Sequence, residues 1–289
     1  MADTTYRANG AQWVLSLPAL LLFLGLLVVP IALTGMLSFN VFDAMSGTQN
    51  SYTLASYLEV LSDSFYYELF ARTALMSLGV TAVCIAIGVP ETLILSRMRP
   101  AWQGGFFVVI LGPLLISVVV RTLGWSLLLG REGFINSALM ALGLIDQPLQ
   151  LMFTLTGVVI ALTHVMMPFM VISVWSTLQK VDGQIAHAAR SLGAGPVTTF
   201  RRVVLPQLMP GILSGGIIVF TLSASAFATP AMIGGRGVKV VTTAIYDEFL
   251  STMNWPLGAS IAVLLLIAIV FVVIGSNRLI ERKFKQVFV

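Results

Sequence analysis

Six long runs of apolar residues, separated by shorter polar stretches, form the dominant pattern of this chain. The runs cover roughly residues 13–37, 73–95, 104–129, 151–178, 211–229 and 257–279. A helix needs about 20 apolar residues to cross the hydrocarbon core of a bilayer, and each run is close to that length or longer. The pattern therefore predicts six transmembrane helices, and the fold class is an all-α polytopic membrane protein.

The composition agrees with this prediction and excludes a soluble domain. Of the 289 residues, 57% are hydrophobic and only 10% are charged, whereas soluble domains are typically about 45–50% apolar and about 25% charged. Cys84 is the single cysteine, so no disulfide can form within the chain.

Basic residues between the runs predict the orientation, because Lys and Arg are enriched in cytoplasmic loops. Eleven of them fall on one side of the alternating pattern and four on the other. The side with eleven carries Arg7, Arg97, Arg99, Lys180, Arg190, Arg201, Arg202, Arg278, Arg282, Lys283 and Lys285. Both termini and the segment 180–211 are therefore expected to be cytoplasmic. Because the basic residues cluster beside apolar runs, we expect a membrane protein without a nucleic-acid partner.

The polar segment 180–211 is too long for a simple connection. Most connections between packed helices have about two to eight residues. Asp182 is placed to cap a short helix over 184–192, and Gly193 is placed to end it, since glycine tolerates the left-handed C-cap.

A second short helix is expected in the same segment. Gly195-Pro196 predicts a turn, residues 198–205 read as helix, and Pro206 is expected to stop it. The two helices would form an exposed hairpin with a small apolar surface and basic flanks. Such a hairpin is suited to docking into a groove on another protein.

The hairpin also carries a family resemblance. Ala188-Ala189-x-x-x-Gly193, followed by Val203-x-Leu205-Pro206, resembles the "EAA" loop of ABC importer permeases. In that family the loop forms a coupling helix that sits in a cleft of the cytoplasmic ATPase. The resemblance assigns ATPase coupling to His187, Ala188, Ala189, Arg190, Leu192, Gly193, Val203, Leu205 and Pro206. His187 stands where the family has an acidic residue, and Val203 stands where it has isoleucine.

Further stretches are similar to the permeases of spermidine/putrescine importers. They include residues 120–125, 164–171 and 226–235. The resemblance implies the type I ABC importer transmembrane fold, with a cytoplasmic N-terminus at 1–10, an extra first helix at 11–38, a core domain at 70–280 and a cytoplasmic tail at 281–289. Relatives that move ferric iron, thiamine, opines or aminoethylphosphonate share parts of these motifs, so the substrate stays open.

Several polar residues are candidates for the translocation path. Glu91 lies within the second run, where a carboxylate is costly and often marks a pathway or an ion pair. It would either pair with Arg97 or another base, or contact a cation. His164 is a packing residue or a path residue, and Asp247 and Glu248 are solvated or contact substrate. The candidate path residues are Glu91, His164, Tyr246, Asp247 and Glu248.

Two residues in the runs have predicted structural roles. Arg121 lies in the third run and is expected to reach outward or to bond to backbone carbonyls. Pro168 removes a backbone hydrogen bond and is expected to kink the fourth helix. Between the first two runs, residues 40–71 carry acids and tyrosines. They are either a solvated loop or a landing surface for an extracytoplasmic partner.

The chain lacks the motifs of an enzyme that would supply its own energy. It has no G-x-x-x-x-G-K-[ST], no H-E-x-x-H and no C-x-x-C. We therefore expect no catalytic residue and no cofactor on this chain, with ATP and Mg on a partner ATPase. The resemblance to ABC importer permeases implies the partners: two ABC ATPase subunits, a second permease (homologous or identical), an extracytoplasmic solute-binding protein and lipid, in a bacterial inner membrane. A secondary carrier or channel is the alternative class, and an intramembrane enzyme would need a catalytic pair that the sequence lacks.

Overall fold

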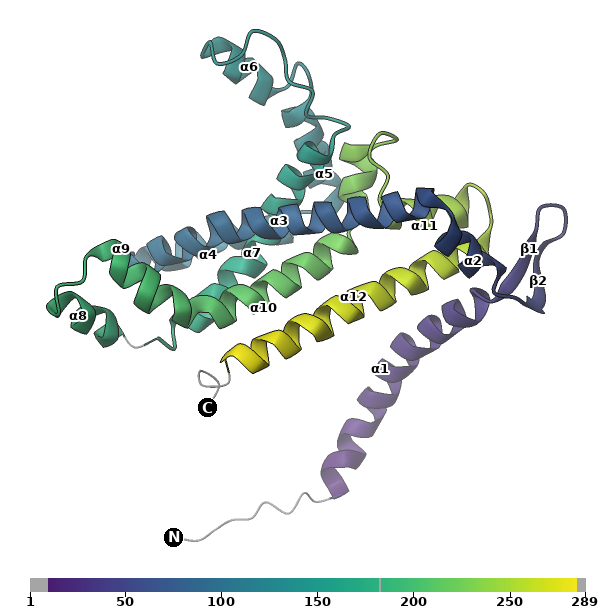
Figure 1. Ribbon diagram of the computed structural model, residues 1–289, viewed down its shortest axis with the longest axis horizontal. Helices are drawn as coiled ribbons and strands as arrows, with labels where there is room; N and C mark the ends of the chain where they lie inside the picture. The colour runs from purple at the N-terminus through teal and green to yellow at the C-terminus, as the bar shows by residue number, and fades with distance from the viewer. Residues whose placement is uncertain (1–9, 182, 285–289) are drawn as a thin grey trace. The chain divides into compact units, whose positions relative to one another are not determined.

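The computed structural model describes residues 10–181 and 183–284 (Figure 1). The chain divides into two compact units, each taken by itself below. The described residues up to Asp63 and Ile245–Leu264 form the first unit. Those of Ser64–Ala244 and from Leu265 onward form the second. The expected cap at Asp182 and the basic residues Arg7 and Lys285 lie outside the described residues.

The first unit begins with α1 (Gly10–Leu37) and a short β-hairpin of β1 (Asn40–Asp43) and β2 (Gly47–Tyr52). The hairpin is an element that the apolar pattern did not predict. Its turn is built by Asp43, whose carboxylate accepts the backbone N–H groups of Met45 and Ser46 at 2.9 and 2.8 Å. These hydrogen bonds, those of Ser46 foremost, hold the pKa of Asp43 below its usual value.

The rest of the first unit is helical. It contains α2 (Ala55–Ser62), most of α11 (Val241–Leu250) and the first part of α12 (Trp255–Phe284). The Ser260 hydroxyl donates to the carbonyl of Ser38 at 3.0 Å, and the hydroxyls of Ser38 and Tyr57 lie 2.7 Å apart. Ser38 thus joins the end of α1 to both α2 and α12.

The second unit is a bundle centred on α3 (Ser64–Arg97), α7 (Leu155–Leu178) and α10 (Leu205–Ala224), which pack against one another. Its core contains fully buried side chains from all three helices, among them Met76, Val80, Leu162, Met170 and Val219. Around this core lie α4 (Pro100–Leu115), α5 (Val118–Leu129), α6 (Phe134–Ala141), α8 (Gly183–Ser191), α9 (Pro196–Thr199), η1 (Phe200–Val204) and η2 (Pro230–Gly234).

Small residues allow α7 and α10 to approach closely. The Ser173 hydroxyl of α7 donates to the Gly211 carbonyl at 2.8 Å and lies 2.9 Å from the Ser214 hydroxyl. A methyl group at Gly215 would lie 3.0 Å from the sulfur of Met170. This seam shows one of the ways in which small residues in lipid permit tight helix packing.

The number of spans agrees with the prediction, but the third span is not one helix. In the described part of the chain five helices are long and apolar enough to cross a membrane, and a bent pair makes a sixth. The predicted helix over 104–129 breaks at Ile116 and Ser117, both extended, and the segments on either side meet at 98°. A run of apolar residues predicts that a segment lies in lipid. It does not predict that the backbone leaves the helix at Ile116 and Ser117.

Candidate functional site

The segment between α7 and α10 folds as a helical hairpin of α8, α9 and η1 at one end of the second unit (Figure 1). Gly193 ends α8 in the left-handed conformation, with φ of +88°. Its N–H donates to the Arg190 carbonyl at 2.9 Å, and the N–H of Ala194 donates to the Ala189 carbonyl at 3.1 Å. These two bonds are the Schellman motif, in which glycine is preferred because it has no Cβ.

A buried threonine fixes the second arm of the hairpin. The Thr199 hydroxyl donates to the Gly195 carbonyl at 3.0 Å, and its side chain is buried. The helix α8 contacts both α9 and η1, so the two arms support each other. The predicted hairpin is therefore present, with α8 at Gly183–Ser191 close to the expected 184–192.

The second arm does not stop at Pro206 as the sequence suggested. Instead, the helical backbone runs from Pro196 through η1 into α10, as far as Ala224. Pro206 lies in the first turn of α10, just after the wide turn η1, where the Leu205 N–H bonds to the Phe200 carbonyl five residues back. Proline removes one N–H and crowds the preceding turn. A turn with i to i+5 bonds accommodates it without ending the helix.

The hairpin exposes both apolar and basic side chains. Leu192 and Val197 are 90% and 76% exposed, and Ile185 is exposed as well. His187, Arg190, Arg201 and Arg202 are also exposed, and residues 183–211 contain no acid. Ala189 and Val203 are half-buried, while Leu205 packs against the core of the bundle. Leu205 therefore anchors the hairpin, and Leu192 and Val197 lie on its free surface.

Two of the candidate path residues lie on neighbouring helices of the bundle but at different depths. Cys84 of α3 lies level with α7 at Thr163, because its thiol donates to the Thr163 carbonyl at 3.8 Å. Glu91 is seven residues further along α3, which is about 10 Å at 1.5 Å per residue. The structure therefore does not gather Glu91 and His164 into one cluster.

Glu91 is half-buried, and the pairing with Arg97, one of the alternatives that the sequence left open, is not formed among the described residues. The two residues are six positions apart on α3, whereas neighbours on a helix surface are three or four apart. Pro168 lies inside α7, buried within the bundle.

His164 interacts with a residue that sequence reasoning had not selected. The indole N–H of Trp125 on α5 donates to His164 Nδ1 at 3.3 Å, and the two rings meet edge to face with centroids 5.5 Å apart. Trp125 follows Arg121 by four residues, so both lie on one face of α5. The spacing of four residues from Arg121 is the sequence feature that could have identified Trp125 as a neighbour of the polar residues in the third and fourth spans.

Arg121 bonds to a backbone carbonyl, as the sequence predicted. Its guanidinium donates to the carbonyl of Pro113, in the last turn of α4. The break at Ile116 leaves carbonyls at the end of α4 without their usual helical partners. Arg121, in the first turn of α5, therefore caps the end of α4, the other half of the broken span.

Replacing Arg121 with methionine should weaken this broken span. The Pro113 carbonyl would lose its donor, and an unmet polar group in an apolar setting costs about 1–2 kcal/mol. Thermal unfolding of the purified protein in detergent measures the loss, and Arg131→Met, at an exposed position, is the control. A melting temperature equal to that of the control variant would contradict the capping role.

The remaining candidates, Tyr246, Asp247 and Glu248, lie in α11 within the first unit. Tyr246 is exposed, and the Thr252 hydroxyl donates to the carboxylate of Glu248 at 2.6 Å. Partial burial, with the charges of Glu248 and Asp63, raises the pKa of Glu59 on α2. The first unit thus carries an acidic region formed by α2 and α11.

Among the described residues, no group of three or more His, Cys, Asp or Glu is arranged to hold a metal ion.

Comparison with known proteins gives one consistent family. Residues 8–286 match the family model described as "Binding-protein-dependent transport system inner membrane component". The chain is 30% identical over 249 residues to the spermidine/putrescine transport system permease protein PotB of Escherichia coli K12, covering 85% of this chain and 90% of PotB. It is 30% identical over 226 residues to PotB of Haemophilus influenzae, covering 77% of this chain and 79% of that protein.

A further relative, which matches over a shorter stretch, and two solved structures extend the comparison. The molybdenum transport system permease protein ModB of Mycobacterium bovis is 31% identical over 196 residues, covering 68% of this chain and 72% of ModB. A bacterial alginate ABC transporter, solved with its periplasmic protein bound to an alginate pentasaccharide, matches with a TM-score of 0.79 at 15% identity and 95% coverage of both chains. The MetNI methionine ABC transporter matches with a TM-score of 0.55 at 19% identity, covering 73% of this chain and 92% of that one.

Proposed function

Because the chain belongs to the family of binding-protein-dependent transport system inner membrane components, we propose that it forms half of the path by which a polyamine enters the cell. The chain is a permease subunit of an ABC importer, and ATP hydrolysis takes place on a separate subunit. The observation that carries the proposal is the helical hairpin of α8, α9 and η1, with its exposed Leu192 and Val197.

We assign coupling to this hairpin. Leu192 and Val197 would enter an apolar cleft of the ATPase, and Arg190, Arg201 and Arg202 would face acidic residues at its rim. Burial of two large side chains on docking would contribute roughly 3–5 kcal/mol before the costs of association. Since η1 continues directly into α10, a push on the hairpin would move α10, and with it the packed helix α7. Rigid-body motion of this kind switches access from one side of a membrane to the other.

The assembly would contain two ATPase subunits holding ATP and Mg, a second permease that is homologous or identical, and an extracytoplasmic binding protein. In this arrangement residues 11–38 are a helix additional to the core of 70–280, and both termini and the hairpin are cytoplasmic. The excess of basic residues on the side of the hairpin supports this orientation.

A polyamine is the substrate that the relatives support best, since PotB proteins cover most of the chain. A polyamine carries several positive charges, and the acidic region of the first unit is suited to attract cations. Glu59, Asp63, Asp247 and Glu248 would raise the local concentration of a cationic solute or guide a basic surface of the binding protein. Glu91 and His164 would contact the solute within the bundle of the second unit. The same importer class would serve ferric iron, thiamine, an opine or aminoethylphosphonate if the binding protein delivers one of these.

Purification of the tagged chain with its partners tests the proposal. We expect an ATPase, a second permease and a binding protein to co-purify, and proteoliposomes of the complex to take up spermidine only with ATP inside. Uptake driven by a proton or sodium gradient without an ATPase would instead identify a secondary carrier. ATP-driven uptake of another solute supplied by the binding protein would retain the importer and reject the polyamine.

A further inference from the structure

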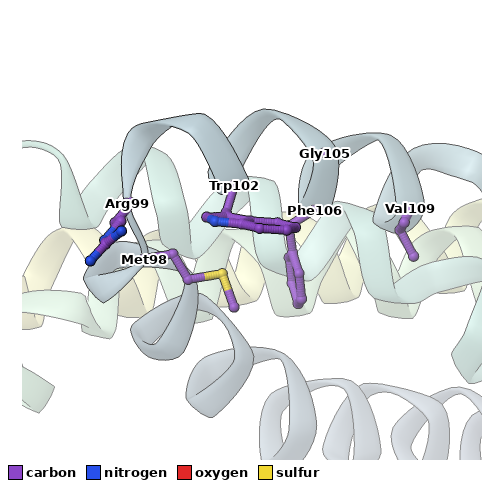
Figure 2. A pocket seen from close by; sticks show the side chains of 6 residues that line it. All are labelled: Met98, Arg99, Trp102, Gly105, Phe106 and Val109. Atoms are coloured by element: carbon purple, nitrogen blue, oxygen red, sulfur yellow. The ribbon is translucent and has the colours of Figure 1, made fainter.

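An open pocket of about 630 Å³ lies beside the junction of α3 and α4, apart from the hairpin (Figure 2). Its lining consists of Met98, Arg99, Trp102, Gly105, Phe106 and Val109. The spacing of three and four residues places the α4 members on one helix face. Figure 2 shows Arg99 at one end of this row and Val109 at the other, with the aromatic side chains between them.

The pocket presents its apolar side chains to the surroundings. Trp102 and Val109 are 72% and 74% exposed. Phe106, by contrast, packs partly against the small core cluster of Leu95, Ile110 and Val171. At Gly105 there is open space, because an added methyl group would meet no atom within 4 Å. The face is therefore apolar and concave, and no other described segment of the chain covers it.

The charge is confined to one end. Arg97 and Arg99 flank the junction, and residues 92–130 contain no acidic residue. Within the described residues, Arg99 forms no ion pair. From Arg99 to Val109 is ten residues of helix, about 15 Å long. This is the depth of one leaflet, since the hydrocarbon core is about 30 Å thick.

We propose that this pocket binds an anionic phospholipid, with the headgroup phosphate on Arg99 and one acyl chain along Trp102, Gly105, Phe106 and Val109. A guanidinium recognises a phosphate with two parallel hydrogen bonds. Tryptophan beside it is typical of the boundary between headgroups and acyl chains. The missing side chain at Gly105 makes the space in which the acyl chain lies. The lipid would hold α3 and α4 together at the point where the backbone turns between them.

Lipid retention by the purified complex tests the proposal. Native mass spectrometry with phosphatidylglycerol and phosphatidylcholine, added at matched concentrations, measures the two affinities. Arg99→Gln should weaken phosphatidylglycerol binding roughly tenfold, since a hydrogen bond to a charged group is lost. Phosphatidylcholine carries the same phosphate but no net charge, so its binding should weaken less, and the preference of the complex for phosphatidylglycerol should be reduced.

The neighbouring glycines supply a matched pair. Gly104 and Gly105 are adjacent on α4 and both have open space around an added side chain, but only Gly105 lines the pocket. Gly105→Leu should displace the phosphatidylglycerol, whereas Gly104→Leu and Arg97→Gln should retain it. Equal affinity in the Gly105→Leu and Gly104→Leu complexes would overturn the proposal. So would a disulfide crosslink from Trp102→Cys to a cysteine of another subunit, because a protein segment would then occupy the pocket.

Discussion

Replacing Gly193 with valine should reduce ATP-driven uptake at least tenfold while the protein remains in the membrane. Gly193 has φ of +88°, a conformation that costs an L-residue with a side chain about 1–2 kcal/mol. A β-branched side chain is among the least tolerated there. The strain falls on the turn that joins α8 to α9, so we expect the Schellman bonds to Arg190 and Ala189 to break. The direction of α8 would change, and Leu192 would no longer meet the ATPase.

Gly195 provides the control for this experiment. It lies two residues further along the same turn, with φ of −66° and ψ of 163°, which valine adopts readily. Neither position has an atom within 4 Å of an added Cβ, so the two substitutions differ in backbone strain and not in crowding. Uptake into proteoliposomes, with the amount of inserted protein measured in parallel, gives the comparison. If Gly193→Val and Gly195→Val transport equally well, the fixed turn is not needed for coupling.

The apolar runs predicted the membrane spans because burial in lipid depends on length and hydropathy alone. The same property explains where this prediction failed. Within 104–129 nearly every residue is apolar, so the pattern could not indicate that Ile116 and Ser117 are extended. Arg121 was expected either to reach outward or to bond to backbone carbonyls, and the structure shows the second of these. The position of Arg121 was therefore a sign of the break. A charged residue in an apolar run needs exposed backbone carbonyls, and a helix break supplies them.

The hairpin shows a similar division between local and long-range signals. The end of α8 at Gly193 was predictable, since glycine is the usual residue for a left-handed cap. The second arm was not, because Pro206 was expected to end a helix that instead continues through η1. Pro206 follows the wide turn η1, and Leu205 beside it packs against the bundle. This packing is a long-range contact that the local sequence does not show. Trp125, likewise, became a candidate only when the fold placed α5 beside His164.

The seam between α7 and α10 leads to the second large expected effect. Gly211→Ala should destabilise the protein by about 3 kcal/mol, near the upper end for an overfilled core. A methyl group at Gly211 would fall on the hydroxyl of Thr177 and within 2.9 Å of the Ser173 carbonyl oxygen. A backbone carbonyl cannot move without shifting α7. The two helices must therefore separate, and the bond from the Ser173 hydroxyl to the Gly211 carbonyl is lost as well.

Gly216→Ala on the same helix separates crowding from the change in residue type. An added methyl there lies 3.6 Å from the Thr81 methyl, an ordinary contact, and alanine is the better helix former. We expect Gly216→Ala to unfold at or slightly above the temperature of the parent chain, and Gly211→Ala well below it. In the proposed coupling, η1 would pass the motion of the hairpin into α10, so a loosened seam should also reduce uptake per molecule at temperatures where the protein stays folded. Destabilisation of both variants to the same extent would mean that helical glycines, and not the contact with Thr177 and Ser173, hold this part of the bundle together.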